Sequence, residues 1–497
     1  MSSTPTITPE ALVQVLGTWE AGRGPLKRRL AQALRTAIES GELHAGIRLP
    51  AERNLAGALR ISRGTVVAAY ASLREDALVA SRQGSGTRVP ERDTAPARPP
   101  LPSVESLAPA ARRSAVFRHL LEAPSDTIEL LGSHLPACAE LSADLLASCG
   151  AELETLAKEP GYLPLGLPAL RRAIAEHLTS KGLATSEEQV LVTNGAQQAI
   201  SLLAALFVSR GDAVAVENPT YITGIDVFAG AGGRLLTLPV GADGVSVAAL
   251  ADLLSRGGVR LVYLMPTFHN PTGALVPLDA RKAIAALADR HGVPLLEDDT
   301  LADLSLSGEP PPPVGAFARS GAVITIGSLS KLIWGGLRIG WIRGDEALVL
   351  RLARLRIVTD LGSSIAGQLL ATRLLARAEA IKRVRRREAA ESLDHLCALL
   401  AKDLPSWAYA RPKGGLSLWV RLPHGDATTF ADVALRHGVA IVPGATASPD
   451  RSFADHVRIP FVLAPERMAE GVSRLAAAWA SYAPAAERKR AALEVIV

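Results

Sequence analysis

The segment SLSKLIWGGLRIGW covers residues 328–341 and governs the interpretation of the whole chain. It follows the apolar run VITI of residues 323–326, which is typical of a buried strand. Lys331 therefore stands just beyond a strand end, among serines and glycines, as a candidate amine for a Schiff base. A lysine by itself is far more often a surface charge, so the neighbouring motifs have to decide.

Three other motifs would suit a charged aromatic ring beside that lysine. Asp298 ends the run LLED, where a buried carboxylate could keep a pyridinium nitrogen protonated. Asn270 lies in PTFHNPTG, a turn that directs its amide toward a phenolate oxygen, and Tyr221 in NPTY could stack on the ring. Taken singly, these residues have ordinary alternatives as a helix cap, a turn residue and a core residue. Their joint occurrence at strand ends favours a single site.

The run TNGAQQAI of residues 193–200 predicts a phosphate site in the same region. It passes from a strand into a helix through a turn of small residues. Backbone N–H groups at such a helix N-terminus bind phosphate. Arg338 would add a fixed cation for the same phosphate.

Short β-rich runs alternate with helical patterns here, which predicts an α/β domain with a largely parallel sheet. The predicted strands are Val190–Thr193, Ala213–Glu217, Arg234–Leu238, Leu261–Met265, Pro294–Asp298, Val323–Ile326 and Gly340–Arg343. Helical patterns such as Ala196–Phe207 and Leu278–Arg290 lie between them. From about residue 385 a basic helix leads to the strand-like runs Gly415–Arg421, Ala440–Val442 and Arg458–Phe461. This change of character indicates a smaller α+β subdomain.

A proline-rich stretch, PERDTAPARPPLPS at residues 90–103, has the composition of a linker. We therefore predict a domain at residues 1–90, a linker at 91–125 and a body at 126–497, with the small subdomain at about 385–497. The first domain carries twelve basic and seven acidic side chains, whereas the remaining 407 residues carry 42 of each, so the first domain accounts for the whole net charge of +5. A basic domain on a neutral body favours a polyanionic partner for that domain alone.

The first domain has the outline of a winged helix-turn-helix. Helical patterns at Pro25–Ser40, Ala51–Leu59 and Arg63–Leu73 precede two strand-like pieces, Leu78–Arg82 and Gly86–Val89. Ser62 can cap the third helix, which leaves Arg63 and Thr65 pointing outward, and Arg53 is placed to reach a phosphate. A glycine-rich tip that includes Gly84 would let the backbone approach a groove of DNA.

Composition narrows the setting of the protein. Three cysteines in 497 residues form no disulfide framework and no zinc motif, which favours a reducing cytosol and no metal site. We see no signal peptide at the N-terminus and no apolar run of the length that spans a bilayer. We therefore expect a cytoplasmic protein that is not inserted in a membrane.

The first domain resembles the winged helix of the GntR family of transcription regulators over about residues 25–89. The shared signatures are Leu-Pro-x-Glu-Arg, Ser-Arg-x-Thr-Val and Gly-Ser-Gly-Thr. The resemblance implies a double-stranded DNA operator as the partner. It names Arg53, Ser62, Arg63, Thr65 and Gly84 as the DNA contacts.

The body resembles the fold-type I, class I/II aminotransferases, which bind pyridoxal 5′-phosphate (PLP), over about residues 128–475. The motifs YLPLGLPALR and PKGGLSLWV, at residues 162–171 and 412–420, add to the match. The resemblance implies Lys331 as the internal aldimine, Asp298 on the pyridine nitrogen and Asn270 on the ring hydroxyl. Around the phosphate it implies Gly195, Ala196, Gln197, Ser328 and Arg338. Arg458, in HVRIPF, matches the arginine that holds a substrate α-carboxylate.

One position departs from this pattern. Related sequences read Glu-Asp-Asp-x-Tyr, whereas Leu301 stands here where the tyrosine would donate to the ring hydroxyl. We expect PLP binding to survive the change and proton-transfer chemistry to weaken. Whether the protein is an efficient enzyme is therefore in doubt.

The two domains together resemble the MocR subfamily of GntR-type regulators. The resemblance implies a PLP-dependent, DNA-binding regulator, a homodimer, and an effector that is an amino compound or PLP itself. The alternative is an active aminotransferase with an appended DNA-binding domain, and a PLP-sensing repressor is a subtype that the sequence does not separate.

Overall fold

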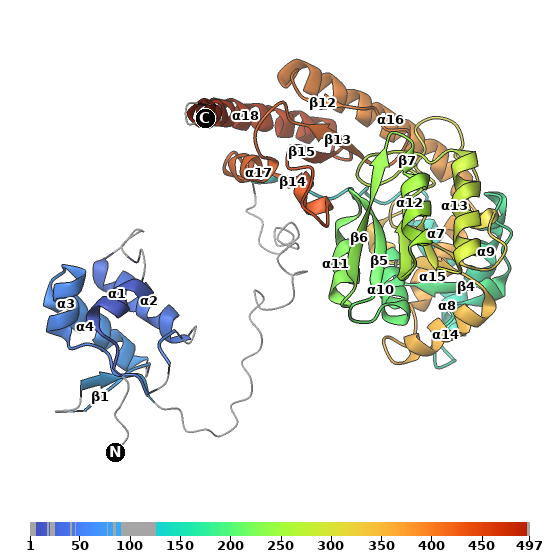
Figure 1. Cartoon of the computed structure of the whole chain (residues 1–497). Helices are drawn as coiled ribbons and strands as arrows, with labels where there is room; N and C mark the ends of the chain where they lie inside the picture. Colours follow the sequence, from blue (N-terminus) through green and yellow to red (C-terminus); the bar gives the residue numbers. More distant parts are fainter. Residues whose placement is uncertain are drawn as a thin grey trace. The chain divides into compact units, whose positions relative to one another are not determined.

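The structure is a computed structural model of the chain, and it divides into two compact units, Met1–Pro102 and Ser103–Val497. It describes residues 6–16, 19, 25–39, 42–44, 46–76, 78–82, 86–90 and 126–494. The predicted linker at 91–125 and the predicted DNA contact Gly84 lie outside these residues. The two units are drawn in Figure 1, and each is described by itself.

The first unit is a winged helix-turn-helix. Its helices are α1 (Pro9–Leu16), α2 (Leu26–Glu39), α3 (Glu52–Leu59) and α4 (Arg63–Glu75), and its wing pairs β1 (Ala80–Arg82) with β2 (Gly86–Arg88) in antiparallel fashion. Three helices and the hairpin follow the expected pattern within a few residues. Helix α1 was not predicted. It is short, and Leu12 and Leu16 bury its inner face in the unit's core, so packing rather than length stabilises it.

The larger unit contains an eight-stranded sheet whose strands run in the order β4-β11-β10-β9-β8-β5-β6-β7. The strands are β4 (Val190–Thr193), β5 (Ala213–Asn218), β6 (Arg234–Gly241), β7 (Gly244–Val245), β8 (Val259–Leu264), β9 (Leu295–Asp298), β10 (Val323–Ser328) and β11 (Gly340–Arg343). Neighbours from β10 to β6 pair in parallel, whereas β11 is antiparallel to both of its neighbours. The sheet is therefore mostly parallel, as predicted.

Helices cover this sheet, which explains why its central strands are continuous apolar runs. The helices around it are α7 (Ala143–Ser148), α8 (Gly150–Leu156), α9 (Pro168–Ser180), α10 (Ala196–Phe207), α11 (Ile222–Gly230), α12 (Val247–Ser255), α13 (Leu278–His291), α14 (Glu346–Ile357) and α15 (Ile365–Leu375). Helix α10 packs on β4, β10 and β11, and α12 packs on β6 and on α13 (Figure 1). Because β10, β9, β8, β5 and β6 run in parallel, their carboxyl ends meet at one edge of the sheet.

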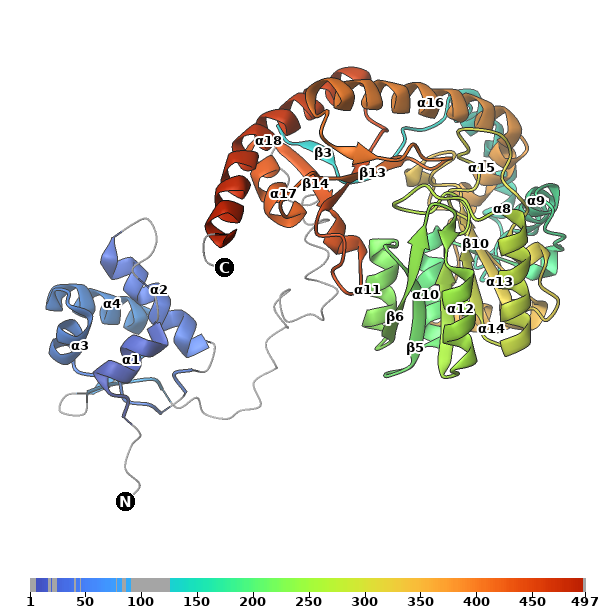
Figure 2. The ribbon, with the colours of Figure 1, turned by 45° about the horizontal axis from the view of Figure 1, so that its top comes forward.

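A second, five-stranded sheet has the order β12-β13-β15-β14-β3. Its strands are β3 (Ile128–Leu130), β12 (Ala408–Tyr409), β13 (Ser417–Arg421), β14 (Val439–Pro443) and β15 (His456–Pro460). The helices of this part are α16 (Ala378–Asp403), α17 (Ala427–Arg436) and α18 (Pro465–Glu494), and α16 and α18 lie side by side in Figure 2.

The predicted bounds of the small subdomain, about 385–497, leave out two of its parts. Strand β3 pairs in parallel with β14, with Ile128 opposite Val439. Most of the sequence of the body lies between these two strands. A three-residue strand has too short a pattern to reveal so distant a partner. Helix α16 also begins earlier, at Ala378.

Two features are absent from the described residues. No helix in these ranges is long and apolar enough to cross a membrane. Nor do the described histidine, cysteine, aspartate and glutamate side chains form a group of three that could hold a metal ion.

Candidate functional site

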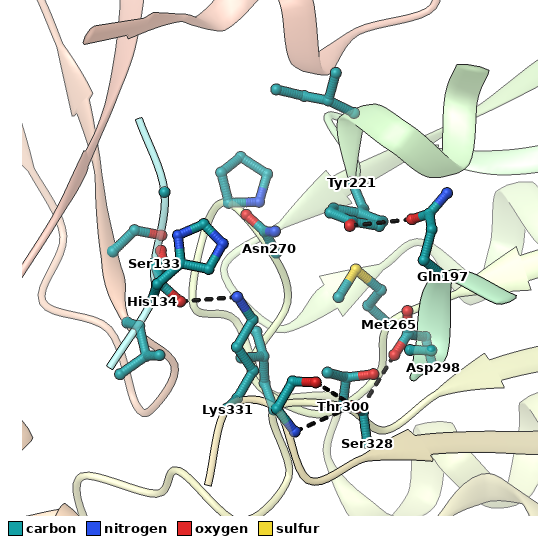
Figure 3. Close-up of a pocket in the computed structure, with 18 of the residues that line it drawn as sticks. Ser133, His134, Gln197, Tyr221, Met265, Asn270, Asp298, Thr300, Ser328 and Lys331 are labelled. Atoms are coloured by element: carbon teal, nitrogen blue, oxygen red, sulfur yellow. Dashed lines mark hydrogen bonds between the residues drawn. The ribbon is translucent and has the colours of Figure 1, made fainter. Parts of the chain in front are cut away.

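A cavity of about 360 Å³ opens at the carboxyl ends of β5, β8, β9 and β10, where open α/β sheets bind their ligands. All residues predicted to bind cofactor or effector line it, except Gly195. Figure 3 shows several of them converging from different elements on one space. The segment after β3 and residues of β13 and β15 form the wall opposite the large sheet.

Lys331 follows β10 and lies on the cavity wall. Its Nζ donates a hydrogen bond to the Ser133 carbonyl oxygen at 2.7 Å (Figure 3). Burial and the positive charge of Arg458 lower the pKa of Lys331 to about 8, against the opposing pull of Asp298. A substantial fraction of this amine is therefore neutral near physiological pH, which is the form that attacks a carbonyl carbon.

Asp298 ends β9 and is almost completely buried. Its Oδ2 accepts a hydrogen bond from the Tyr263 hydroxyl at 2.8 Å, and its Oδ1 accepts one from the Thr300 N–H at 3.0 Å. Burial raises the pKa of Asp298, while these two donors favour the ionised form and oppose the rise. A cationic N–H group in the cavity would stabilise the carboxylate further.

Arg338 and the start of α10 form the anion-binding end of the cavity. Gly195 caps α10 with a φ of 90°, and a Cβ at this position would lie 3.2 Å from Arg338 Nη2. The glycine therefore permits both the left-handed turn and the close approach of the guanidinium. Arg338 Nη2 is held by the Asn194 carbonyl oxygen at 2.7 Å, which fixes a cation beside a helix N-terminus.

Gln197, on the first turn of α10, is engaged with two hydroxyl groups. Its Oε1 accepts hydrogen bonds from Tyr221 Oη at 3.2 Å and from Thr223 Oγ1 at 2.9 Å. The carboxamide therefore orients the Tyr221 ring. In Figure 3, Tyr221 and Thr300 lie on opposite sides of the space between Lys331 and Asp298.

The remaining predicted residues also reach the cavity. Ala196 lies on the first turn of α10, and the Asn270 side chain faces the same space as Lys331 (Figure 3). The Ser328 hydroxyl donates to the Ile339 carbonyl oxygen at 3.2 Å and to Ser330 Oγ at 3.0 Å.

Arg458, in β15, is 8% exposed. Its Nε donates to Ser417 Oγ at 3.3 Å, its Nη1 to the Leu131 carbonyl oxygen at 2.8 Å, and its Nη2 to Ser133 Oγ. Within the described ranges, no carboxylate forms an ion pair with it. A guanidinium has five N–H donors, so one on each terminal nitrogen stays available. Burial lowers the pKa of Arg458 to about 10, so the group remains a cation.

Leu301 is buried in the core and lines the cavity. An aliphatic side chain provides no hydrogen-bond donor there. The neighbouring Thr300 lines the cavity, and its side chain favours the ionised form of Asp298. Leucine in place of tyrosine at position 301 therefore removes a hydrogen-bond donor from the cavity wall.

The four predicted DNA contacts that the structure describes lie on or beside the helix-turn-helix. Arg53 on α3 and Arg63 on α4 are exposed. Ser62 caps α4, and its Oγ accepts from the Thr65 N–H at 3.2 Å and lies 2.9 Å from Thr65 Oγ1. The cap thus fixes the N-terminal turn that presents Arg63 outward.

Sequence reasoning missed several residues of the site. Tyr263 lies inside an apolar strand, and only the pairing of β8 with β9 brings it to Asp298. Ser133 and His134 belong to a segment without a motif, and their place depends on the distant β3–β14 pairing. Behind the cavity, His269 Nε2 lies 3.5 Å from Glu217 Oε2, and both side chains are fully buried.

These residues fit PLP. The cavity offers a partly neutral lysine amine, a buried carboxylate, an aromatic face and a helix N-terminus with a fixed arginine. These groups match the aldehyde, the pyridine nitrogen, the ring and the phosphate of that cofactor. When bound, PLP supplies an electron sink for reactions at the carbon next to an amine.

Comparisons with known proteins divide the chain at the same place. Residues 150–475 match the family "Aminotransferase class I and II", and residues 26–89 match "Bacterial regulatory proteins, gntR family". The HTH-type transcriptional regulator YisV of Bacillus subtilis is 31% identical over 86% of this chain and 91% of its own. The probable rhizopine catabolism regulatory protein MocR of Rhizobium meliloti is 32% identical over 64% of this chain and 65% of its own.

Solved structures give the same result for the body. LysN, an α-aminoadipate aminotransferase from Thermus thermophilus in complex with N-(5′-phosphopyridoxyl)-L-leucine, superposes with a TM-score of 0.68. It is 31% identical and covers 76% of this chain and 98% of its own. A kynurenine aminotransferase from Pyrococcus horikoshii, solved with PMP, also gives 0.68, at 30% identity over 74% of this chain and 94% of its own. The chain therefore belongs to the MocR-type regulators, in which a GntR helix-turn-helix domain is joined to a PLP-dependent, aminotransferase-like domain of class I and II.

Proposed function

We propose that this protein is a transcription regulator that binds operator DNA through α4 and the wing and responds to an amino compound that meets PLP in the body. One observation carries the proposal. Arg458 is a buried cation without a carboxylate partner among the described residues, and it lines the same cavity as Lys331. Leaving a buried charge unpaired is costly, so the arrangement favours an anionic ligand that is bound rather than built in.

In this proposal each part of the cofactor has its own partner. Lys331 carries it covalently, Asp298 holds the ring nitrogen and Asn270 the ring hydroxyl, while Tyr221 packs on the ring. The phosphate lies against α10 and Arg338, lined by Gly195, Ala196, Gln197 and Ser328. Arg458 then holds the carboxylate of the effector through its two available N–H groups.

On the DNA side, Arg63 and Thr65 would read the major groove and Arg53 a phosphate. The Ser62 hydroxyl is occupied as the cap of α4, so we assign it a positioning role in addition to any direct contact. A ligand can change operator affinity only through its different affinities for two states of the protein.

We also propose a homodimer, because two reading domains would address two half-sites. Two exposed apolar side chains of the body support this. Tyr162 is 68% exposed and Val358 80% exposed. A Cβ on Gly362 would lie 2.8 Å from the Leu163 carbonyl oxygen, so the two loops that carry these side chains touch. A second copy of the chain would cover them. The site of action in this proposal is the cytoplasm, where the DNA lies.

The alternative is an active aminotransferase that also binds DNA, and the cofactor residues support it. Leu301 favours the regulator, because no hydroxyl stands at its position to tune the cofactor ring. Two measurements on the full chain separate the functions: gel-shift binding to the DNA that flanks its own gene, and steady-state turnover of amino acids with a keto acid. Operator binding that responds to PLP and an amino acid, with slow turnover, is expected. Rapid turnover without binding to any promoter would overturn the proposal that the protein is a regulator.

Leu301→Tyr sharpens this test. Restoring the donor should move the pH at which the absorbance of the bound cofactor changes, and it should increase turnover, with operator binding unchanged. Leu301→Phe has the same ring without the hydroxyl and is the matched control. An identical spectrum and rate for both variants would mean that the missing hydroxyl does not limit the chemistry.

A further inference from the structure

The wall that faces the effector is apolar and contributes a single cation. Arg458, Ser417 and Ser133 contribute the polar groups near the carboxylate site. Around them the lining is aliphatic and buried, formed by Leu131, Ile222, Leu301, Leu416 and Ala447. These residues lie in segments that precede or follow strands of both sheets, so an effector side chain that leaves the Arg458 site meets hydrocarbon on several sides.

The other charged groups of the cavity already have partners or face the cofactor. Arg338 is fixed at the opposite end by the Asn194 carbonyl oxygen, beside the start of α10. Lys331 and Asp298 face the cofactor in the proposed function. Among the described residues that line this cavity, no further lysine, arginine or acidic side chain is present.

His134 is the remaining titratable group on this wall. It lies beside Lys331 in Figure 3 and is exposed at the edge of the cavity. Burial of part of the ring and the charges of Lys331 and Arg458 lower the pKa of His134. The imidazole therefore stays neutral near physiological pH and supplies no counter-charge to a second carboxylate.

From these contacts we propose that the effector is an α-amino monocarboxylic acid with an uncharged, mainly apolar side chain, whose carboxylate lies on Arg458 and whose side chain lies on the aliphatic wall. A charged side chain of either sign would lose its hydration there without gaining a partner. The inference rests on the proposed function, because it takes the Arg458 site as the carboxylate site. It goes further by naming the class of side chain.

Three amino acids with the same five-carbon skeleton test the proposal. L-norvaline ends in a methyl group, L-glutamate in a carboxylate and L-ornithine in an ammonium. Each is titrated into the PLP-loaded full chain while the absorbance spectrum of the bound cofactor is followed. We expect an apparent Kd for norvaline that is lower than for either charged probe by about tenfold or more. Equal or tighter binding of glutamate or ornithine would overturn the proposal.

A variant at the edge of the cavity checks the placement of the side chain without disturbing the core. His134→Arg adds a cation next to the aliphatic wall and should move the glutamate-to-norvaline affinity ratio toward glutamate by about tenfold. His134→Gln is the matched neutral control and should leave the ratio near its original value. A ratio that does not change in His134→Arg would mean that the side chain lies elsewhere, against the proposal.

The failures can be told apart. If none of the three amino acids alters the spectrum at millimolar concentration, the effector is not an α-amino acid, and the amino-acid part of the proposed function falls together with this inference. If glutamate or ornithine binds best and changes operator affinity, the proposed function stands and only the assigned side-chain class is wrong.

Discussion

The reading surface of the first unit and the cavity of the second use the same kind of residue in opposite surroundings. Arg63 is exposed on α4, whereas Arg458 is 8% exposed and donates three hydrogen bonds to the protein. The charge of an exposed cation is screened by salt, and it contributes to DNA affinity together with neighbouring cations. A buried one is poorly screened and already oriented, so a single substitution should remove most of its effect.

The largest expected effect is therefore in the cavity. Lys331→Ala should abolish the absorbance band of covalently bound PLP completely, because the only amine on the described cavity wall is removed. The exposed Lys158→Ala is the matched control and should keep the band. Operator binding without PLP should persist in both variants. A normal band in Lys331→Ala would refute the assignment of this lysine.

A smaller effect is expected on the reading surface. Arg63→Ala should weaken operator binding by about 1–3 kcal/mol, or roughly ten- to a hundredfold, with the PLP spectrum unchanged. Arg28→Ala removes an equally exposed arginine from α2 and should cost less. The measurement is a gel-shift titration at fixed ionic strength. If Arg63→Ala and Arg28→Ala lose the same affinity, α4 is not the recognition helix.

Salt distinguishes the two regions by the same logic. Operator affinity should fall by several orders of magnitude, roughly 10³ for about six phosphate contacts, between 50 and 200 mM salt. The apparent affinity for PLP should change far less over this range, since its partners are local and one is covalent. Equal salt dependence of both would contradict the contrast between an exposed and a buried site.

What the sequence could predict follows the same division. In the large sheet, a strand buried on both faces reads as a continuous apolar run, and the polar residue after it marks the site edge, as for Asp298 and Lys331. The cap at Ser62 is equally local. Residues that reach the cavity only through the pairing of distant strands have no such local pattern in the sequence. Ser133 follows the three-residue β3, and Tyr263 becomes a donor to Asp298 only once β8 and β9 are paired.

The structure gives the positions of the site residues, whereas their roles remain predictions. The position of Arg458 in β15 explains why it is buried, but only the resemblance to aminotransferases suggested a carboxylate as its ligand. Its unpaired state became visible only with its three neutral acceptors in place. For Leu301 the sequence revealed the missing tyrosine, and the structure adds that the aliphatic side chain is buried and lines the cavity.

The smallest effect concerns the fully buried pair Glu217 and His269, whose shifted pKa values link stability to pH. Burial raises the pKa of Glu217 to about 8, with a contribution from Asp298, although the Met265 N–H opposes the rise. Burial lowers the pKa of His269 to about 3. Between pH 4.5 and 8 the folded chain therefore keeps a proton on Glu217 that the unfolded chain loses, so stability falls as the pH rises.

The histidine acts in the opposite direction, but only below its ordinary pKa of 6.5, where the unfolded chain alone takes up the proton. From pH 6.5 to 8 the Glu217 effect stands without that opposition and amounts to at most about 2 kcal/mol. Glu217→Gln keeps an acceptor for Met265 and removes the titration, so the fall in Tm of the body over this interval should shrink by a few degrees. The exposed Glu154→Gln should leave the fall unchanged. An equal fall in all three proteins, measured by calorimetry, would mean that Glu217 is already ionised in the folded chain and that burial shifts this carboxyl less than its surroundings imply.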